Sequence, residues 1–299
     1  MLKRIGIYLK EMYPVIPRLI LGVIIFSEIY FIILLNNGIT NFNIGISELV
    51  GSFTVFSFLL SLRIADDFKD YELDCKLFKE RPLPSGRVKK KDLVIFITLL
   101  IIVTVVLNIL FMNNFIYFCV LYVYGILMSV WFFQRSKIQK SLPLALITHN
   151  PVQIILNVYI ISFTCTKYSI NMVSWVNALV AMTLYFPALI WEISRKIRAP
   201  KDETEYVTYS KIFGYKKAVK FVMLLTVIDI ITNILLVLNL NKISVIVLLI
   251  NLAFFIVNSI IFLKDPERFK FVSKVEIYTY ITECIMIATV FTYLLFGAI

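Results

Sequence analysis

Long apolar stretches alternate with short polar ones along the whole chain. Nine of the apolar stretches have the roughly 17–25 residues that an α-helix needs to cross a bilayer. They lie at 17–36, 44–65, 93–112, 114–134, 142–164, 172–194, 218–239, 243–263 and 277–298. This pattern predicts an all-α integral membrane protein, a bundle of nine transmembrane helices in which residues 1–299 form a single domain.

The residues before the first apolar stretch are partly basic. Lys3, Arg4 and Lys10 precede it, as the basic residues of a signal peptide would. The stretch is about 20 residues long, contains Glu28 and lacks a small-residue cleavage site. We therefore expect a retained first span that follows a short helix lying at the membrane surface.

The positive charges are distributed very unevenly between the loops. Of the 30 Lys and Arg residues, all but Lys167 and Lys242 belong to the N-terminal segment, counting Arg18, or to the loops after spans two, four, six and eight and the span ends next to them. Cytoplasmic loops carry such an excess of positive charge. One missed or extra span would scramble the distribution, so it supports nine spans. The charge distribution places the N-terminus and the charged cap loops, which are the loops after spans two, four, six and eight, in the cytoplasm. The C-terminus is then outside. We therefore expect a multi-pass protein of the cytoplasmic membrane.

The amino-acid composition supports an integral membrane protein and excludes some kinds of metal site. The chain is 60% hydrophobic, with a mean hydropathy of +0.87, which is typical of a membrane protein. The net charge of +11 follows from the membrane topology, and we expect no nucleic-acid partner. A single histidine and four cysteines without CxxC spacing provide neither a multi-histidine metal site nor a zinc site.

Four aspartates lie where the second span ends. In the first acidic motif, residues 63–74, Asp66, Asp70 and Asp74 have the i, i+4, i+8 spacing of one helix face, and Asp67 flanks them. Carboxylates this close repel unless a cation lies between them, and a hard divalent ion prefers oxygen ligands. Arg63 and Lys69 in the same motif would attract an anion. The pattern favours a site for a metal-bound phosphate ester, and the alternative is a solvated helix end with mixed charges.

The sequence Arg81-Pro-Leu-Pro-Ser-Gly86 follows this motif and predicts a rigid turn. With Asp66, Asp67, Asp70 and Asp74, it resembles the first motif of the UbiA superfamily of intramembrane prenyltransferases, usually written NDxxDxxxD with a following RPxxSG. The nine spans and the cytoplasmic motif are also similar to that family. Position 66 is Asp where the family usually has Asn, which keeps an oxygen ligand.

The resemblance implies that Mg²⁺ bound by the motif aspartates holds an isoprenoid diphosphate. Departure of the diphosphate leaves an allylic cation, which an acceptor attacks. Asp67, Asp70 and Asp74 would be catalytic, with Asp66 as a further metal ligand. The expected diphosphate contacts are Arg63, Lys69, Arg81, Ser85, Tyr124, Lys137, Arg195, Lys196 and Arg198. The lipid bilayer gives access to the acceptor, and the sequence does not indicate an oligomeric state.

The loop after span six, the second acidic loop (residues 192–203), departs from the family pattern. Glu192 stands in place of the first aspartate, and Lys196 occupies the position of the second. Counting back from Thr208 makes Asp202 the alternative second ligand. We therefore expect Glu192 and Asp202 to bind metal. Lys196 would replace a second metal ion, or the substrate would carry fewer phosphate charges. A third interpretation is a non-catalytic homologue, and the intact aspartates from Asp66 to Asp74 argue against it.

Several polar residues lie inside the predicted spans, where ionisable groups are costly. Glu28 and Glu283 could face a central cavity, whereas Glu48 and Asp229 lie nearer the outer half or an end. The sequence His149-Asn150-Pro151 predicts a break in span five, and His149 is the titratable residue there. It is either a general base or, more simply, an interhelical hydrogen-bonding group at a kink.

Three functions fit the sequence. The first is Mg²⁺-dependent transfer of a prenyl group to a lipophilic or aromatic acceptor. The second is transfer of a sugar phosphate to a polyprenyl phosphate, which the altered second acidic loop would suit. The third is membrane transport, and the location of the charges in loops rather than within the spans argues against it.

Overall fold

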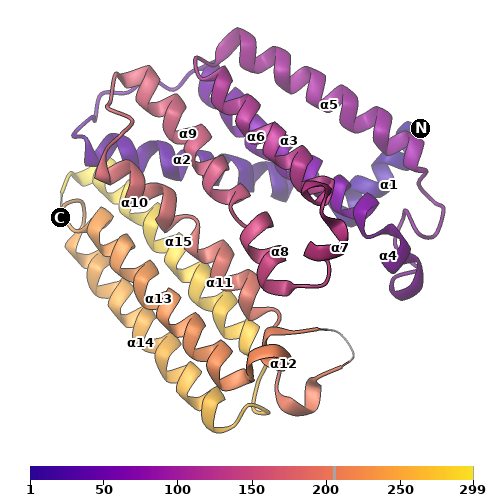
Figure 1. Ribbon diagram of the computed structural model, residues 1–299. Coiled ribbons are helices and arrows are strands. Elements are labelled where there is room, and N and C mark those ends of the chain that lie inside the picture. Colours follow the sequence, from indigo (N-terminus) through magenta and orange to yellow (C-terminus); the bar gives the residue numbers. More distant parts are fainter. Residues whose placement is uncertain (205–206, 299) are drawn as a thin grey trace. The chain divides into compact units, whose positions relative to one another are not determined.

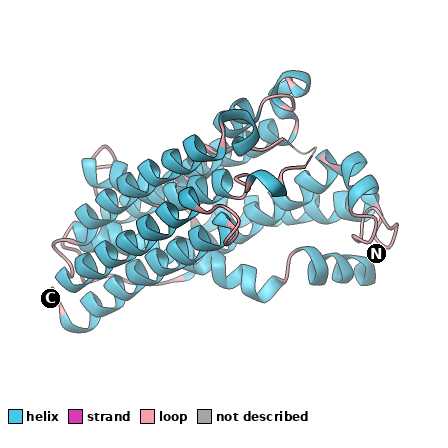
Figure 2. Ribbon diagram, turned by 90° about the horizontal axis from the view of Figure 1, so that it is seen from below, coloured by secondary structure: helices cyan, strands magenta, loops and turns pink. Residues whose placement is uncertain are grey.

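The computed structural model describes residues 1–204 and 207–298, and α-helix is the dominant element throughout (Figure 1). Within these ranges there are no strands, and loops and short 3₁₀ turns join the helices (Figure 2). The predicted all-α class is therefore confirmed.

Eight helical segments are long and apolar enough to cross a membrane. The predicted fourth span, 114–134, differs: α6 covers only Phe115–Ser129, and its 15 residues measure about 22 Å, short of a hydrocarbon core of about 30 Å. The count of nine is thus not confirmed. The helix ends early because Trp131, Phe132 and Phe133 adopt left-handed φ values of 55°, 48° and 58° in the short turn η1 (Trp131–Phe133).

Two of the eight segments contain a break. The predicted break in span five is present, because α8 (Leu142–His149) and α9 (Val152–Tyr168) are separated at Pro151. Span six divides into α10 (Trp175–Thr183) and α11 (Phe186–Ser194), a break that was not predicted from the apolar pattern. Pro187 in the first turn of α11 explains it, since proline removes a backbone N–H and its ring clashes with the carbonyl four residues earlier.

The chain divides into two compact units. Unit 1 contains Met1–Ser27, Phe42–Arg135 and Ser162–Ser169, and unit 2 contains Glu28–Asn41, Ser136–Ile161 and Ile170–Ile299. The helices α2 (Val15–Asn36) and α9 contribute residues to both. The short helix α7 (Arg135–Ile138) begins at the boundary. The single-domain organisation stays a prediction.

Unit 1 is built around α3 (Ile46–Lys69), the most buried of its spans. The helix α5 (Lys90–Phe111) packs alongside α3 (Figure 1) and leaves most of its apolar surface exposed, as a lipid-facing helix does. The helix α2 approaches α3 closely at Gly22, where an added Cβ would lie 3.0 Å from the Ser52 carbonyl oxygen. Glycine permits this approach because it has no side chain to clash.

Two shorter helices complete the part of unit 1 that carries the first acidic motif. The helix α1 (Leu2–Met12) corresponds to the expected surface helix before the first span. The helix α4 (Tyr71–Leu77) follows α3 after a single intervening residue, Asp70. The motif therefore lies at the end of the most buried helix of the unit.

Unit 2 contains three long helices, α13 (Tyr215–Val237), α14 (Lys242–Lys264) and α15 (Phe271–Phe296), which lie side by side in Figure 1. Interhelical hydrogen bonds join α14 to α15: the Asn251 amide donates to the Thr282 hydroxyl at 3.0 Å, and the Thr289 hydroxyl donates to Ser244 at 2.6 Å. Such bonds are common between membrane helices. The short elements η2 (Pro200–Asp202) and α12 (Tyr209–Phe213) lie between α11 and α13.

Candidate functional site

The first acidic motif keeps its helical spacing although α3 ends within it. Asp70 ends α3 and begins α4, with φ −99° and ψ 9°. The Asp70 N–H still donates to the Asp66 carbonyl, and the Asp74 N–H to the Asp70 carbonyl, both at 2.9 Å. The three aspartates therefore keep the i, i+4, i+8 order that the sequence indicates.

Asp67 is buried and bonded through both carboxylate oxygens. The Tyr8 hydroxyl donates to Oδ2 at 2.6 Å, and Arg63 Nη2 lies 2.8 Å from Oδ1. Burial raises the pKa of Tyr8 well above its usual range, and the negative charge of Asp67 raises it further, so the phenol remains a donor. Arg63 was expected to contact diphosphate, and in this structure it pairs with Asp67.

Asp74 is also buried, and its partner is the predicted turn. Arg81 Nη1 donates to Asp74 Oδ2 at 2.8 Å, and the guanidinium lies 4.0 Å from the centre of the Phe78 ring. The turn closes through a 3.0 Å bond from the Ser85 N–H to the Arg81 carbonyl, and Gly86 takes a left-handed φ of 75°. The Ser85 hydroxyl itself donates to the Pro82 carbonyl at 3.2 Å.

The remaining two aspartates are more accessible. The Asp66 side chain is 46% exposed, with Lys69 Nζ at 3.7 Å, and Asp70 is exposed. Lys69 also lies 4.0 Å from the centre of the Trp131 ring, a cation–π contact. Trp131 is held in this position by the left-handed turn η1. Trp131 was not among the residues predicted from the sequence, because no local sequence pattern indicates the turn.

The expected gathering of carboxylates around one metal is not seen. Among residues 1–204 and 207–298, no three Asp, Glu, His or Cys side chains lie close enough to hold a metal ion. Arg63, Lys69 and Arg81 each pair with one aspartate. The donor chemistry nevertheless fits Mg²⁺, because four carboxylates at helical spacing provide only hard oxygen ligands and two of them are open to solvent.

The next two predicted contacts, Tyr124 and Lys137, belong to different units. Tyr124 is half-buried on α6, and its ring meets the Phe132 ring edge-on at 5.4 Å. Lys137 is exposed on α7. Their contacts with phosphate stay predictions.

The second acidic loop is arranged differently from the expectation. Glu192 accepts a 2.9 Å hydrogen bond from Arg195 and lies 3.0 Å from Lys196 Nζ. Among the described residues, no second carboxylate lies with Glu192 to form a metal site. Asp202 is exposed in η2. The predicted pairing of Glu192 and Asp202 as metal ligands is therefore not seen, because the local cations satisfy Glu192 instead.

The rest of this loop is held by side-chain bonds. Glu203 accepts hydrogen bonds from the Thr208 and Ser210 hydroxyls, the first at 2.7 Å. Arg198 donates its backbone N–H to Ser210 at 2.9 Å and its guanidinium to Thr204 at 2.9 Å. A cavity of about 380 Å³ lies beside the loop, and its charged lining residues are Arg195, Arg198, Asp202 and Lys270.

The intramembrane acids have protein partners. Glu28 and Glu283 are neighbours that interact with each other. Asp229 accepts a 2.6 Å bond from the Tyr278 hydroxyl, and Glu48 pairs with Lys167. His149 Nδ1 lies 2.9 Å from the Thr148 hydroxyl. None of these contacts assigns a catalytic role.

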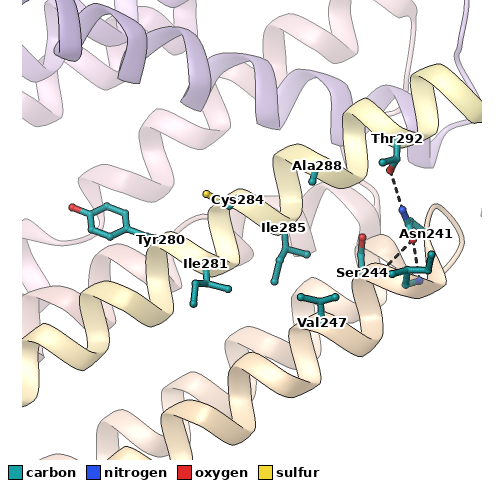
Figure 3. A pocket seen from close by; sticks show the side chains of 10 residues that line it. Asn241, Ser244, Val247, Tyr280, Ile281, Cys284, Ile285, Ala288 and Thr292 are labelled. Carbon is teal, nitrogen blue, oxygen red and sulfur yellow. Dashed lines mark hydrogen bonds between the residues drawn. The ribbon is translucent and has the colours of Figure 1, made fainter.

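A further cavity, of about 480 Å³, opens between α14 and α15 (Figure 3). Figure 3 shows Val247, Ile281 and Ile285 along it, with the Asn241 amide donating to Thr292 at 2.9 Å at one end. Its lining contains no charged side chain, so this cavity suits an apolar chain and not a diphosphate.

Comparisons with known proteins agree with this architecture. A solved structure of digeranylgeranylglyceryl phosphate synthase is similar, with a TM-score of 0.64, 18% sequence identity and 99% of each chain covered; at this identity the likeness shows a common fold. No curated protein matches the sequence. Residues 29–272, most of the chain, match the UbiA prenyltransferase family. The chain is therefore an integral membrane prenyltransferase of the UbiA family.

Proposed function

We propose that the protein transfers a prenyl group from an isoprenoid diphosphate to a lipophilic or aromatic acceptor, with Mg²⁺ as cofactor. The observation that carries this proposal is the first acidic motif, in which four aspartates at helical spacing lie among Arg63, Lys69 and Arg81. Carboxylates for a metal together with cations for an anion suit a substrate whose leaving group is a diphosphate.

The residues divide into two roles. Asp66, Asp67, Asp70 and Asp74 would bind Mg²⁺, and the bound metal would neutralise negative charge on the diphosphate. Lys69 and Arg81 would contact the diphosphate oxygens, as would Arg63 once released from Asp67. Cleavage of the carbon–oxygen bond leaves both bonding electrons on the diphosphate, so these cations stabilise the charge that develops there. The acceptor then forms the new bond to the allylic carbon and loses a proton.

Arg195, Lys196 and Arg198 are proposed as further diphosphate contacts in unit 2. The pairing of Glu192 with Arg195 and Lys196 gives this loop a local excess of positive charge where a second carboxylate pair was expected. Positive side chains can take the place of a second metal ion in balancing phosphate charge. The same observation favours a second candidate, an enzyme that uses a polyprenyl phosphate as acceptor for a sugar phosphate. A monophosphate carries less negative charge than a diphosphate, so fewer cations are needed to balance it.

The test of the proposal is diphosphate release from labelled isoprenoid diphosphates by the purified protein, with and without Mg²⁺. Asp70→Asn removes an exposed carboxylate and should abolish Mg²⁺-dependent release. Glu72→Gln is the matched control, because it removes one exposed negative charge two residues away, outside the motif spacing. Release by Asp70→Asn at the wild-type rate would contradict the site assignment.

Lys196→Asp tests whether Lys196 takes the place of a second metal ion or whether the substrate simply carries fewer phosphate charges. If Lys196 stands in for a cation, the variant should need more Mg²⁺ for half-maximal release, since it adds a carboxylate where a positive charge was. An unchanged Mg²⁺ dependence would show that Lys196 has no such role.

A further inference from the structure

Three polar residues of α1 lie along one stripe of the helix. Arg4, Tyr8 and Glu11 have the i, i+4, i+7 spacing that places side chains on the same face. Each of them contacts a different segment of unit 1. The three segments are the first turn of α5, the end of α3 and the turn that contains Arg81 to Gly86.

The two outer contacts are ion pairs. The Arg4 guanidinium pairs with Asp92 in the first turn of α5, with Nη2 at 3.0 Å from Oδ1. Glu11 accepts from Arg87 Nη2 at 2.8 Å, and the same guanidinium donates to the Glu80 carbonyl at 2.6 Å and to the Ser85 hydroxyl at 3.1 Å. Arg87 therefore ties α1 to both ends of the turn that positions Arg81.

Apolar packing lies beneath this stripe. Tyr8 is fully buried in a cluster with Ile64 of α3, Leu83 of the turn, Val88 just after the turn, and Leu93 of α5. The cluster joins the same three segments that the polar contacts reach. The helix α1 thus fixes the parts of the first acidic motif relative to one another.

The middle contact, from Tyr8, reaches the motif itself. Its hydroxyl donates to Asp67 Oδ2 at 2.6 Å, while Arg63 occupies Oδ1. A carboxylate has about four acceptor positions, so two directions on Asp67 remain for other ligands. Tyr13, the other buried tyrosine in this cluster, donates instead to the Phe56 carbonyl at 3.2 Å, away from any aspartate. A buried phenol here does not need a carboxylate partner, which makes the Tyr8 contact specific.

We propose that α1 is a clamp for the first acidic motif and that Tyr8 is a positioning residue, which holds the Asp67 carboxylate in the orientation that binds a divalent cation. Hydrogen bonds from outer residues commonly orient metal-binding carboxylates in this way. The role rests on the proposed function, since it requires that Asp67 binds the metal.

The experiment compares Tyr8→Phe with Tyr13→Phe, each of which removes one buried hydroxyl and keeps the ring. The measurements are Mn²⁺ affinity by electron paramagnetic resonance, the Mg²⁺-dependent rise in unfolding temperature, and kcat and KM for prenyl diphosphate. Tyr8→Phe should bind Mn²⁺ about 10- to 100-fold more weakly and lose kcat, because removal of an orienting partner typically costs this much. Tyr13→Phe should match the wild type in Mn²⁺ affinity.

Glu11→Gln provides a variant on the exposed surface, where folding is not at risk. It weakens the outer end of the clamp and should reduce Mn²⁺ affinity less than Tyr8→Phe does. Equal Mn²⁺ affinities for Tyr8→Phe and Tyr13→Phe would overturn the positioning role while leaving the proposed function intact. A wild-type protein that binds no Mn²⁺ and releases no diphosphate would overturn the proposed function itself.

Discussion

The four aspartates of the first acidic motif have unequal environments. Asp67 and Asp74 are buried and fixed by Arg63, Tyr8 and Arg81, whereas Asp66 and Asp70 are accessible. A buried carboxylate is stable only with partners, so the fixed pair depends on its neighbours for orientation and stability. The accessible pair is free to meet a ligand from solution.

Replacement of Arg81 tests this dependence. Arg81→Ala leaves the buried Asp74 carboxylate without its 2.8 Å partner, and we expect the free energy of unfolding to fall by about 1–2 kcal/mol. Thermal or denaturant unfolding in detergent measures the change. Lys79→Ala, at an exposed position before the turn, should leave stability unchanged. Equal stability of the two variants would contradict the pairing.

At the scale of single residues, the sequence indicates the candidate site residues better than it indicates their bonding partners. The spacing of Asp66, Asp70 and Asp74 and the turn at Arg81 to Gly86 could be predicted, because both are local. The bond from Tyr8 to Asp67 joins residues 59 positions apart, and no local pattern encodes it. The pairing of Glu192 with Lys196 follows i, i+4 spacing, and the expectation of a metal ligand obscured it.

At the scale of elements, breaks and turns distinguish this chain from a simple bundle. The apolar pattern shows which segments are buried or face lipid, and it predicted the long helices well. It does not show where a helix stops, because Val130 to Phe133 is as apolar as the helix before it. The left-handed turn η1 ends α6 there and places Trp131 over Lys69.

The left-handed conformation of this turn predicts that a glycine variant is more stable than an alanine variant at position 133. Phe133 is 82% exposed and has a φ of 58°, a conformation that costs a non-glycine residue about 1–2 kcal/mol. Phe133→Gly should therefore be more stable than Phe133→Ala by about 1 kcal/mol, although alanine is ordinarily the better helix former. Thermal unfolding of the two variants measures the difference, and a less stable glycine variant would contradict the assigned turn.

At the scale of the whole molecule, the membrane dictates the architecture. Backbone polar groups must be satisfied inside a bilayer, which is why helices carry the fold. Hydropathy and charge therefore predicted the fold class correctly. The number of spans was harder to predict, because α6 belongs to an apolar stretch of sufficient length but forms only 15 helical residues.

The charge distribution also predicts which loops face the cytoplasm. In a variant that lacks the native cysteines, Lys79→Cys should be protected from a membrane-impermeant maleimide in intact cells. Asn171→Cys, exposed in the loop after span five, should be labelled. The reverse result would contradict the proposed cytoplasmic location of the first acidic motif.

The most direct measurement of the central claim follows a labelled prenyl chain into a membrane product. The purified protein in liposomes is incubated with labelled isoprenoid diphosphate, a lipid extract as the source of acceptor, and Mg²⁺. We predict a labelled lipophilic product that requires Mg²⁺ and is absent with Asp70→Asn. Label that stays in the diphosphate with the wild-type protein, or the same product from Asp70→Asn, would contradict the account.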